Sequence, residues 1–308
     1  MRRGNQTEVK EFILLGLSSN QRVQAALFIL FLVVYTLTLV GNTITIMLAW
    51  SDPRLHKPMY FFLSNFSFVE IWYTTTTVPK MLSDLLSKSK TISITGCFLQ
   101  FYFFFSLGTT ECFILAIMGY DRYLAICHPL RYNMLMSSKI CSCLAATCWI
   151  IGFLWSIMPV ILIRQLPFCG PNEINHFLCD PGPLLELSCL RDYATEVTCS
   201  VWSSLTLLGT FSSTFISYAF IIKTIIRIPS ASGRRKAFST CASHLTVVIT
   251  FFGCVMYMYM RPSGNHPIDV DKAVIVFYTV VTPLLNPIIY TLRNKEVLNA
   301  VKKIVLRL

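Results

Sequence analysis

The chain has 308 residues, of which 54% are apolar and 13% are charged, and its formal net charge is +11. Soluble domains carry about 25% charged residues, so this composition excludes an ordinary soluble enzyme, a disordered chain and a collagen. A basic balance on so apolar a chain points first to membrane topology and only then to acidic partners. The twelve cysteines are too few for a small disulfide-rich scaffold.

Seven stretches are long and apolar enough to cross a bilayer, which requires about 20 residues. They cover residues 23–51, 58–78, 91–120, 140–163, 197–222, 237–260 and 273–292. Five of them hold no charged residue, the second holds only Glu70 and the third only Glu111. Strands of a membrane barrel would be about 10 residues long and would alternate in polarity, which these stretches do not. The sequence therefore predicts an all-α membrane protein, a bundle of seven transmembrane helices.

The distribution of positive charge indicates an extracellular N-terminus, because lysine and arginine concentrate on the cytosolic side of membrane proteins. In that orientation the inner segments hold fifteen such residues, whereas the outer loops hold seven and the N-terminal arm holds four. Asn5, in the triplet Asn-Gln-Thr, is a glycosylation acceptor, which agrees with an extracellular arm. The first apolar stretch is too long for a cleavable signal peptide and would act as an uncleaved anchor.

The stretches form one folding unit, because the connections between them are mostly short. The one long connection is an outer one, 164–196, and the third inner connection, at about 229–235, is compact and basic. We expect a single domain, 1–308, with an extracellular arm (1–22), a helix bundle (23–292) and a cytoplasmic tail (293–308). Apolar residues of the tail recur at helical spacing with lysine and arginine between them, which predicts a short amphipathic helix on the membrane.

Four cysteines fall in or beside the outer loops: Cys97, Cys169, Cys179 and Cys189. In an oxidising compartment they allow three pairings, and each pairing ties Cys97 and the third span to the long outer loop. A metal site at His176, Cys179 and Asp180 is the alternative. Structural disulfides are favoured, because thiols that face the cell exterior seldom stay reduced.

The inner end of the third stretch carries a specific motif, since residues 118–132 read MGYDRYLAICHPLRY. This run closely resembles the signature of odorant receptors, a branch of the rhodopsin-like G-protein-coupled receptors. Similar motifs extend along the chain: GN at 41–42, PMYFFLSN at 58–65, SY at 217–218, KAFSTCASHL at 236–245, PLLNPIIY at 283–290 and RN at 293–294. The resemblance is closest to the large terrestrial-type class, and we predict the pairings Cys97–Cys179 and Cys169–Cys189.

The sequence departs from the family pattern at three positions. Gly119 stands where alanine is usual, and Glu70 stands where aspartate is usual. Phe252 lacks the tyrosine hydroxyl that is common at its position, so a polar contact to the ligand or to the helix switch is missing.

The resemblance implies that Arg122 pairs with Asp121 in the inactive receptor and is released on activation. Arg122 then contacts the G protein and the region of Tyr218, while Tyr290 turns inward. An arginine that merely reaches the membrane interface is the alternative for Arg122. His244 is expected to bond one helix to another, in preference to sensing protons. The residues expected to serve activation and coupling are Asp121, Arg122, Tyr123, Tyr218, His244, Asn286, Pro287 and Tyr290.

Glu70 and Glu111 lie deep in two spans, where a charge costs about 2.5–3.5 kcal/mol. Two explanations stay open: a pair of protonated, hydrogen-bonded acids, or an allosteric sodium ion that favours the inactive state with Asn286 nearby. No other cofactor is expected.

A ligand pocket is predicted from residues that share helix faces three and four positions apart, with the resemblance pointing these faces into the bundle. The predicted lining comprises Phe104, Phe105, Gly108, Thr109, Cys112, Trp202, Ser203, Thr206, Phe252, Val255, Met256, Tyr259, Val276 and Thr279. This lining is apolar and aromatic with a few hydroxyls, and we expect no charge at pocket depth, which suits a small neutral hydrophobic ligand. The outer half of the third span lacks aspartate and residues 273–292 lack lysine, which argues against amine-neurotransmitter and retinal sites.

The sequence therefore predicts an odorant receptor and not an enzyme. As the resemblance implies, it would bind a volatile organic molecule, activate a stimulatory olfactory-type G protein and raise cyclic AMP. We expect it in the plasma membrane of sensory cilia, with the lipid bilayer but no nucleic acid as a partner. A transporter or channel would show repeats or broken helices in matching halves, and the sequence shows neither. A membrane hydrolase is a more distant alternative, because no paired spacing supports a catalytic triad.

Overall fold

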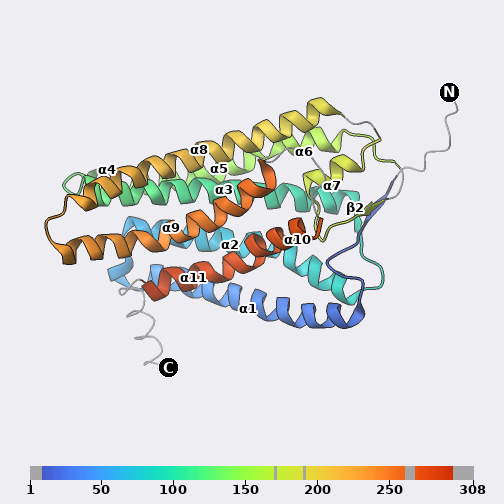
Figure 1. The fold of residues 1–308 in the computed structure, drawn as a ribbon, viewed down its shortest axis with the longest axis horizontal. Helices are drawn as coiled ribbons and strands as arrows, with labels where there is room; N and C mark the ends of the chain where they lie inside the picture. The colour runs from blue at the N-terminus through green and yellow to red at the C-terminus, as the bar shows by residue number, and fades with distance from the viewer. Residues whose placement is uncertain (1–8, 170–171, 190–191, 261–267, 294–308) are drawn as a thin grey trace.

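The computed structural model describes residues 9–169, 172–189, 192–260 and 268–293. Long helices run side by side along one axis (Figure 1). They are α1 (Gln21–Ser51), α2 (Pro58–Leu86), α3 (Ile94–Cys127), α5 (Ser138–Trp155) with α6 (Ile157–Arg164), α8 (Tyr193–Ile226), α9 (Ala231–Tyr259), and α10 (Ile268–Val276) with η2 (Phe277–Val281) and α11 (Thr282–Arg293). Shorter helices are η1 (Pro53–Leu55), α4 (Tyr132–Leu135) and α7 (Pro181–Glu186).

The predicted helix bundle is confirmed. Six of the described helical segments are long and apolar enough to cross a membrane. The remaining predicted span lies in α2, whose 29 residues extend over about 43 Å, more than the ~30 Å hydrocarbon core. Large apolar side chains such as Ile29, Leu37 and Phe215 are exposed on the outside of the bundle, as expected of a surface that faces lipid.

Two helices differ from the predicted spans. The inner connection predicted at about 229–235 is mostly helical, since α9 begins at Ala231. The Ser230 hydroxyl accepts from the Gly233 amide and so caps this helix at its start. The fourth span is divided into α5 and α6 at Ser156, whose hydroxyl donates to the Gly152 carbonyl within the preceding turn.

The seventh span contains a π-helical turn, η2, between α10 and α11. A π turn holds one residue more than an α turn, so it rotates the residues on either side relative to a continuous α-helix. Sequence periodicity gave no sign of this turn, and it changes which residues face the bundle interior.

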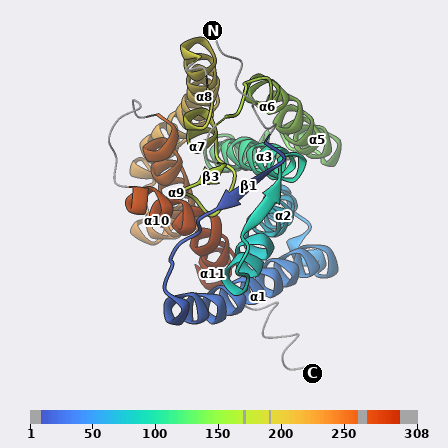
Figure 2. The ribbon, with the colours of Figure 1, turned by 90° about the vertical axis from the view of Figure 1, so that its right-hand side faces the viewer.

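A small sheet at one end of the bundle was not predicted. Strands β1 (Glu11–Leu14), β2 (Thr91–Ser93) and β3 (Glu173–Ile174) lie in the order β2-β1-β3, with β1 antiparallel to β2 and parallel to β3. Phe12 and Leu14 are buried beneath it. Figure 2 shows β1 crossing the end of the bundle, so this part of the arm is an integral part of the fold.

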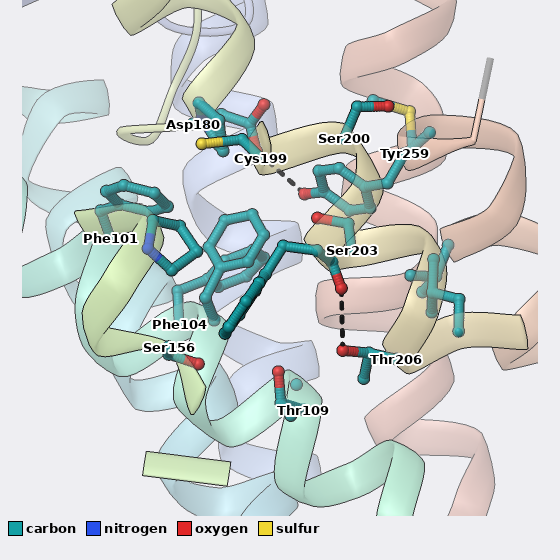
Figure 3. A pocket seen from close by; sticks show the side chains of 18 of the residues that line it. Phe101, Phe104, Thr109, Ser156, Asp180, Cys199, Ser200, Ser203, Thr206 and Tyr259 are labelled. Atoms are coloured by element: carbon teal, nitrogen blue, oxygen red, sulfur yellow. Dashed lines mark hydrogen bonds between the residues drawn. The ribbon is translucent and has the colours of Figure 1, made fainter. Parts of the chain in front are cut away.

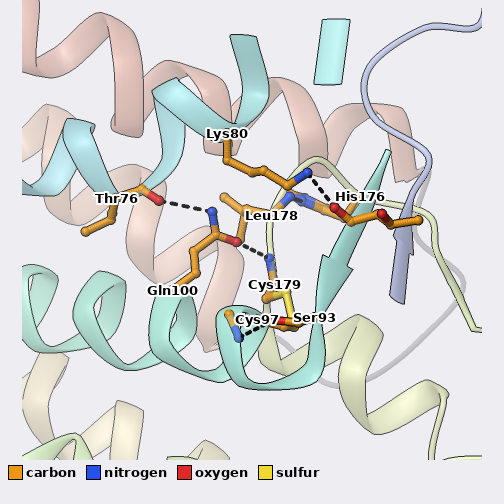
Figure 4. Close-up of a disulfide and its surroundings, with 10 residues drawn as sticks. Thr76, Lys80, Ser93, Cys97, Gln100, His176, Leu178 and Cys179 are labelled. Atoms are coloured by element: carbon orange, nitrogen blue, oxygen red, sulfur yellow. Dashed lines mark hydrogen bonds between the residues drawn. A yellow bond between two sulfur atoms is a disulfide. The ribbon is translucent and has the colours of Figure 1, made fainter. Parts of the chain in front are cut away.

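Both predicted disulfides are present, Cys97–Cys179 and Cys169–Cys189. The first joins the start of α3 to the long connection (Figure 4). Beside it, Gln100 accepts from the Cys179 amide (3.0 Å) and donates to the Thr76 carbonyl (3.0 Å). Because Cys179 is in a disulfide, the alternative metal site with His176 and Asp180 is excluded. Within the described residues no group of three His, Cys, Asp or Glu side chains is placed to hold a metal ion.

Two predictions concern residues outside the described part of the chain. These are the glycosylation acceptor Asn5 and the amphipathic helix of the cytoplasmic tail, residues 294–308.

Candidate ligand cavity and cytoplasmic switch

A cavity of about 210 Å³ lies inside the bundle below the long outer connection. This volume is smaller than the ~300–1,000 Å³ of drug-sized sites, so the cavity suits a small molecule. Figure 3 shows side chains from α3, α8, α9 and the outer connection converging on it. Ten of the predicted residues line the cavity: Phe104, Phe105, Gly108, Thr109, Cys112, Trp202, Ser203, Thr206, Val255 and Tyr259.

The other four predicted residues, Phe252, Met256, Val276 and Thr279, are not among its lining. Phe252 is fully buried between Phe251 and Phe211, with ring centroids 5.5 and 5.6 Å away, and Phe251 lines the cavity in its place. Thr279 belongs to the π turn and donates its hydroxyl to the Ile275 carbonyl. The turn brings Tyr278 to the cavity instead.

Aromatic rings from different helices fix the walls. Tyr73 of α2 stacks on Phe104, with ring centroids 4.8 Å apart. Trp155 stacks on Trp202 at 4.1 Å, and the indole of Trp202 donates to the Trp155 carbonyl (2.9 Å). Helix-face reasoning within one span missed Tyr73 and Trp155, because their contacts depend on how neighbouring helices pack.

The cavity also contains a carboxyl group at its outer end, which was not among the predicted lining residues. Asp180 of the outer connection lines the cavity and is 6% exposed. Its Oδ1 accepts from the Tyr259 hydroxyl (2.9 Å), which lies 3.0 Å from the Tyr278 hydroxyl. Burial raises the pKa of the Asp180 carboxyl to about 6.

Below the cavity, a polar cluster joins α2, α3 and α11. The Asn286 amide donates to Glu70, and the Glu70 and Glu111 carboxyls lie within hydrogen-bonding reach of each other. Glu70 Oε2, Glu111 Oε2 and Asn286 Oδ1 are buried and have no hydrogen-bond partner among the described residues. Such oxygen atoms fit either a shared proton or a hard cation, so both explanations from the sequence remain compatible with the geometry.

The inner end of α3 carries the predicted ion pair. Arg122 Nη2 lies 3.6 Å from Asp121 Oδ2; the Asp121 side chain is buried and that of Arg122 is 12% exposed. The Tyr132 hydroxyl of α4 donates to the other Asp121 oxygen (2.7 Å). Tyr123, the third predicted residue here, has its hydroxyl 2.9 Å from His128 Nε2. The Asp121 carboxylate therefore lies between the Arg122 guanidinium and the Tyr132 hydroxyl.

Facing this pair, His244 links three helices. Its Nδ1 lies 2.7 Å from the Tyr218 hydroxyl of α8, and its Nε2 lies 3.1 Å from the Leu115 carbonyl of α3. The ring is fully buried, which matches the expected helix-to-helix bond. Tyr290 of α11 is buried too, and its hydroxyl has no hydrogen-bond partner within the described segments.

Comparison with known proteins decides the family. A sequence model of the family described as "Olfactory receptor" matches residues 31–307. Olfactory receptor 6F1 of Homo sapiens is 54% identical over 96% of this chain and 96% of its own length. Olfactory receptors 11G2 and 11H6 of Homo sapiens are 52% and 51% identical, over 97% and 96% of this chain and 87% and 90% of their own lengths. The chain belongs to the olfactory receptor family.

This olfactory receptor is a multi-pass membrane protein and not an enzyme. Its family implies odorants as ligands and a G protein as the signalling partner. Two of its departures from the family pattern, Gly119 and Phe252, are compatible with the packing. A Cβ on Gly119 would lie 3.4 Å from Thr214 Cγ2 and 3.6 Å from His244 Cε1, so the usual alanine would make ordinary contacts here. The missing hydroxyl at Phe252 falls on a ring that does not line the cavity.

Proposed function

We propose that this receptor binds an odorant with an apolar body in the cavity below the outer connection and signals through a stimulatory olfactory-type G protein, which raises cyclic AMP. The cavity lined by aromatic side chains carries this proposal. A ligand of about ten heavy atoms at ~0.5 kcal/mol each would bind with a Kd of roughly 0.2 mM, or tens of micromolar with better contacts. We therefore expect the receptor to respond to a broad range of odorants at such concentrations.

The proposed orientation places the N-terminus and the sheet outside the cell, in the membrane of sensory cilia. The excess of lysine and arginine in the opposite segments supports it. Both disulfides involve the connection at the sheet end of the bundle, whereas α4 lies at the other end (Figure 1). Disulfides persist in oxidising compartments, which agrees with the sheet end facing outward.

We propose that Arg122, Asp121, Tyr218, His244 and Tyr290 form the switch. An agonist acts by binding one of two states better than the other. In the state described here Arg122 is held by Asp121, and His244 ties α9 to α3 and α8. Outward movement of α9 would break the His244 bonds and open the space that a G protein needs to reach Arg122.

We also propose that sodium binds between Glu70 and Glu111 and stabilises this resting state. Three buried oxygen atoms support a cation there, because none has a hydrogen-bond partner in the described part of the chain: Glu70 Oε2, Glu111 Oε2 and Asn286 Oδ1. Odorant dose–response curves at 10 and 140 mM sodium test it, with choline replacing the sodium. Sodium is expected to lower odorant potency in the wild type and not in Glu111→Gln. Equal sodium sensitivity in both proteins would leave the shared proton as the explanation.

The coupling proposal is tested by measuring cyclic AMP in cells that co-express the receptor and the olfactory stimulatory G protein, against a chemically broad odorant panel. Arg122→Ala is expected to abolish the response at equal surface expression. Lys139→Ala, which removes an exposed cation from the first turn of α5, is the matched control and keeps the response. A full response from Arg122→Ala would contradict the switch, and odorant-independent current would favour a channel.

A further inference from the structure

The charged residues of the cavity are all acidic. Asp180 lines it from the outer connection and Glu196 from the first turn of α8. The lining that the structure describes contains no lysine, arginine or histidine. A buried carboxylate without a cation is costly, and no described lining residue supplies a cation to Asp180.

The position of Asp180 is fixed by its surroundings. It follows Cys179, whose disulfide to Cys97 and amide bond to Gln100 anchor the backbone, and it caps the start of α7. Figure 3 shows its side chain beside Tyr259 at the rim of the cavity. Each carboxylate oxygen accepts a single described hydrogen bond, from the Tyr259 hydroxyl (2.9 Å) and from the Gly182 amide at a long 3.4 Å. Because a carboxylate has about four acceptor sites, Asp180 retains capacity for a donor within the cavity.

Lys272, a described cation of the outer region, has other partners than Asp180. Lys272 of α10 donates to the Gly16 carbonyl (2.9 Å) and to Asn175 Oδ1 (2.8 Å), and it is not part of the cavity lining. Asp271, next to Lys272, adds negative potential at Asp180. His176 lies in the same outer connection, and burial lowers its pKa to about 3, so it adds no positive charge. Among the described residues, neither Lys272 nor His176 supplies a cation to Asp180, which leaves a place for a cationic group of the ligand.

We propose that the outer end of the cavity is a subsite for a protonated primary amine, so that the receptor takes odorants with an apolar body and an ammonium group that pairs with Asp180. This inference rests on the proposed odorant cavity. The rings of Phe105 and Trp202 would contact the apolar body, and the ammonium would donate to the carboxylate oxygens at the rim. The site differs from an amine site on the third span, where the sequence has no aspartate in the outer half.

The proposal predicts a pH dependence. A primary alkylamine, with a pKa near that of lysine (about 10.4), stays protonated between pH 5 and 8. The carboxyl of Asp180, with its pKa raised by burial to about 6, is ionised above that pH and becomes neutral below it. Amine binding should therefore be full at pH 7.5 and weaken as the pH falls through about 6, whereas binding of a neutral alcohol should change little.

The test uses pairs of equal size, such as cyclohexylamine with cyclohexanol and hexylamine with hexanol. Binding is measured as the ligand-induced rise in Tm of the purified full-length receptor in lipid nanodiscs, and signalling as cyclic AMP. Asp180→Asn removes the charge, yet asparagine still accepts from Tyr259 and caps α7. The matched control is Asp192→Asn, which removes a charge from an exposed cap of α8 outside the cavity lining.

The wild type is expected to bind at least one amine more tightly than its alcohol. Asp180→Asn should weaken amine binding about 10- to 100-fold and alcohol binding less than about threefold, with Asp192→Asn like the wild type. The inference is overturned if no amine exceeds its alcohol, or if Asp180→Asn weakens both members of a pair equally. Neutral odorants that still raise cyclic AMP would leave the proposed function standing in that case. Amine binding without cyclic AMP would instead count against the proposed coupling alone.

Discussion

The contact between α5 and α3 depends on the absence of a side chain at Gly152. A Cβ there would lie 2.1 Å from Thr110 Oγ1 and 3.0 Å from both the Ser106 carbonyl oxygen and the Thr110 amide nitrogen. Two of these three atoms belong to the α3 backbone, which no rotamer change can move. Replacing Gly152 with alanine must therefore displace α5 from α3.

The expected cost follows from two opposing effects. Overpacking a well-filled core destabilises by about 1–3 kcal/mol, and the backbone contacts place Gly152→Ala near the upper end. Alanine recovers up to about 1 kcal/mol through its higher helix propensity. The net loss is therefore about 2 kcal/mol, or a fall in Tm of roughly 4–8 °C at ~2–4 °C per kcal/mol.

The assay is thermal unfolding of the purified receptor, followed by intrinsic fluorescence. Gly209→Ala and Gly253→Ala are matched controls, because a Cβ at either position meets no atom within 4 Å. Both controls should equal or exceed the wild-type Tm. Adding Thr110→Ala to Gly152→Ala removes the nearest obstacle but leaves the backbone contacts, so a double-mutant cycle should show partial rescue. A Gly152→Ala protein as stable as the controls would refute the reasoning.

Three further changes test other parts of the structure. Gly119→Ala should leave the free energy of unfolding unchanged or raise it by up to about 1 kcal/mol, since its Cβ makes only ordinary contacts; a fall in Tm would contradict this. Gln100→Leu leaves the Cys179 amide without its acceptor and removes a second donor from the Thr76 carbonyl. It should cost about 2 kcal/mol and speed hydrogen exchange in the outer connection 172–189, and unchanged protection there would show that the disulfide suffices. His244→Phe preserves an aromatic ring beside Tyr218 but loses the bond to the Leu115 carbonyl, so basal cyclic AMP should rise, and unchanged or lower basal activity would count against a restraining role.

Much of the cavity was predictable from the third and fifth spans, because an uninterrupted α-helix keeps a fixed 3.6-residue period. The predicted lining residues were wrong where that period is interrupted or where the inward face is offset by one residue. The π turn brings Tyr278 to the lining in place of Thr279, and a one-residue difference in facing brings Phe251 in place of Phe252. The carboxyl of Asp180 was missed because it comes from an irregular connection, where no periodicity indicates the direction of a side chain.

The sequence by itself determined the membrane-spanning helices, because a bilayer requires about 20 apolar residues for each crossing and leaves no backbone polar group unpaired. It also determined the family, through local motifs such as the run around Arg122. Only the tertiary structure decided which distant groups meet. The Asn286 amide reaches Glu70 from 216 residues away, and β1 pairs with two strands that lie far along the chain. Strands of two to four residues have little propensity of their own, so they form only where the folded bundle brings their partners together.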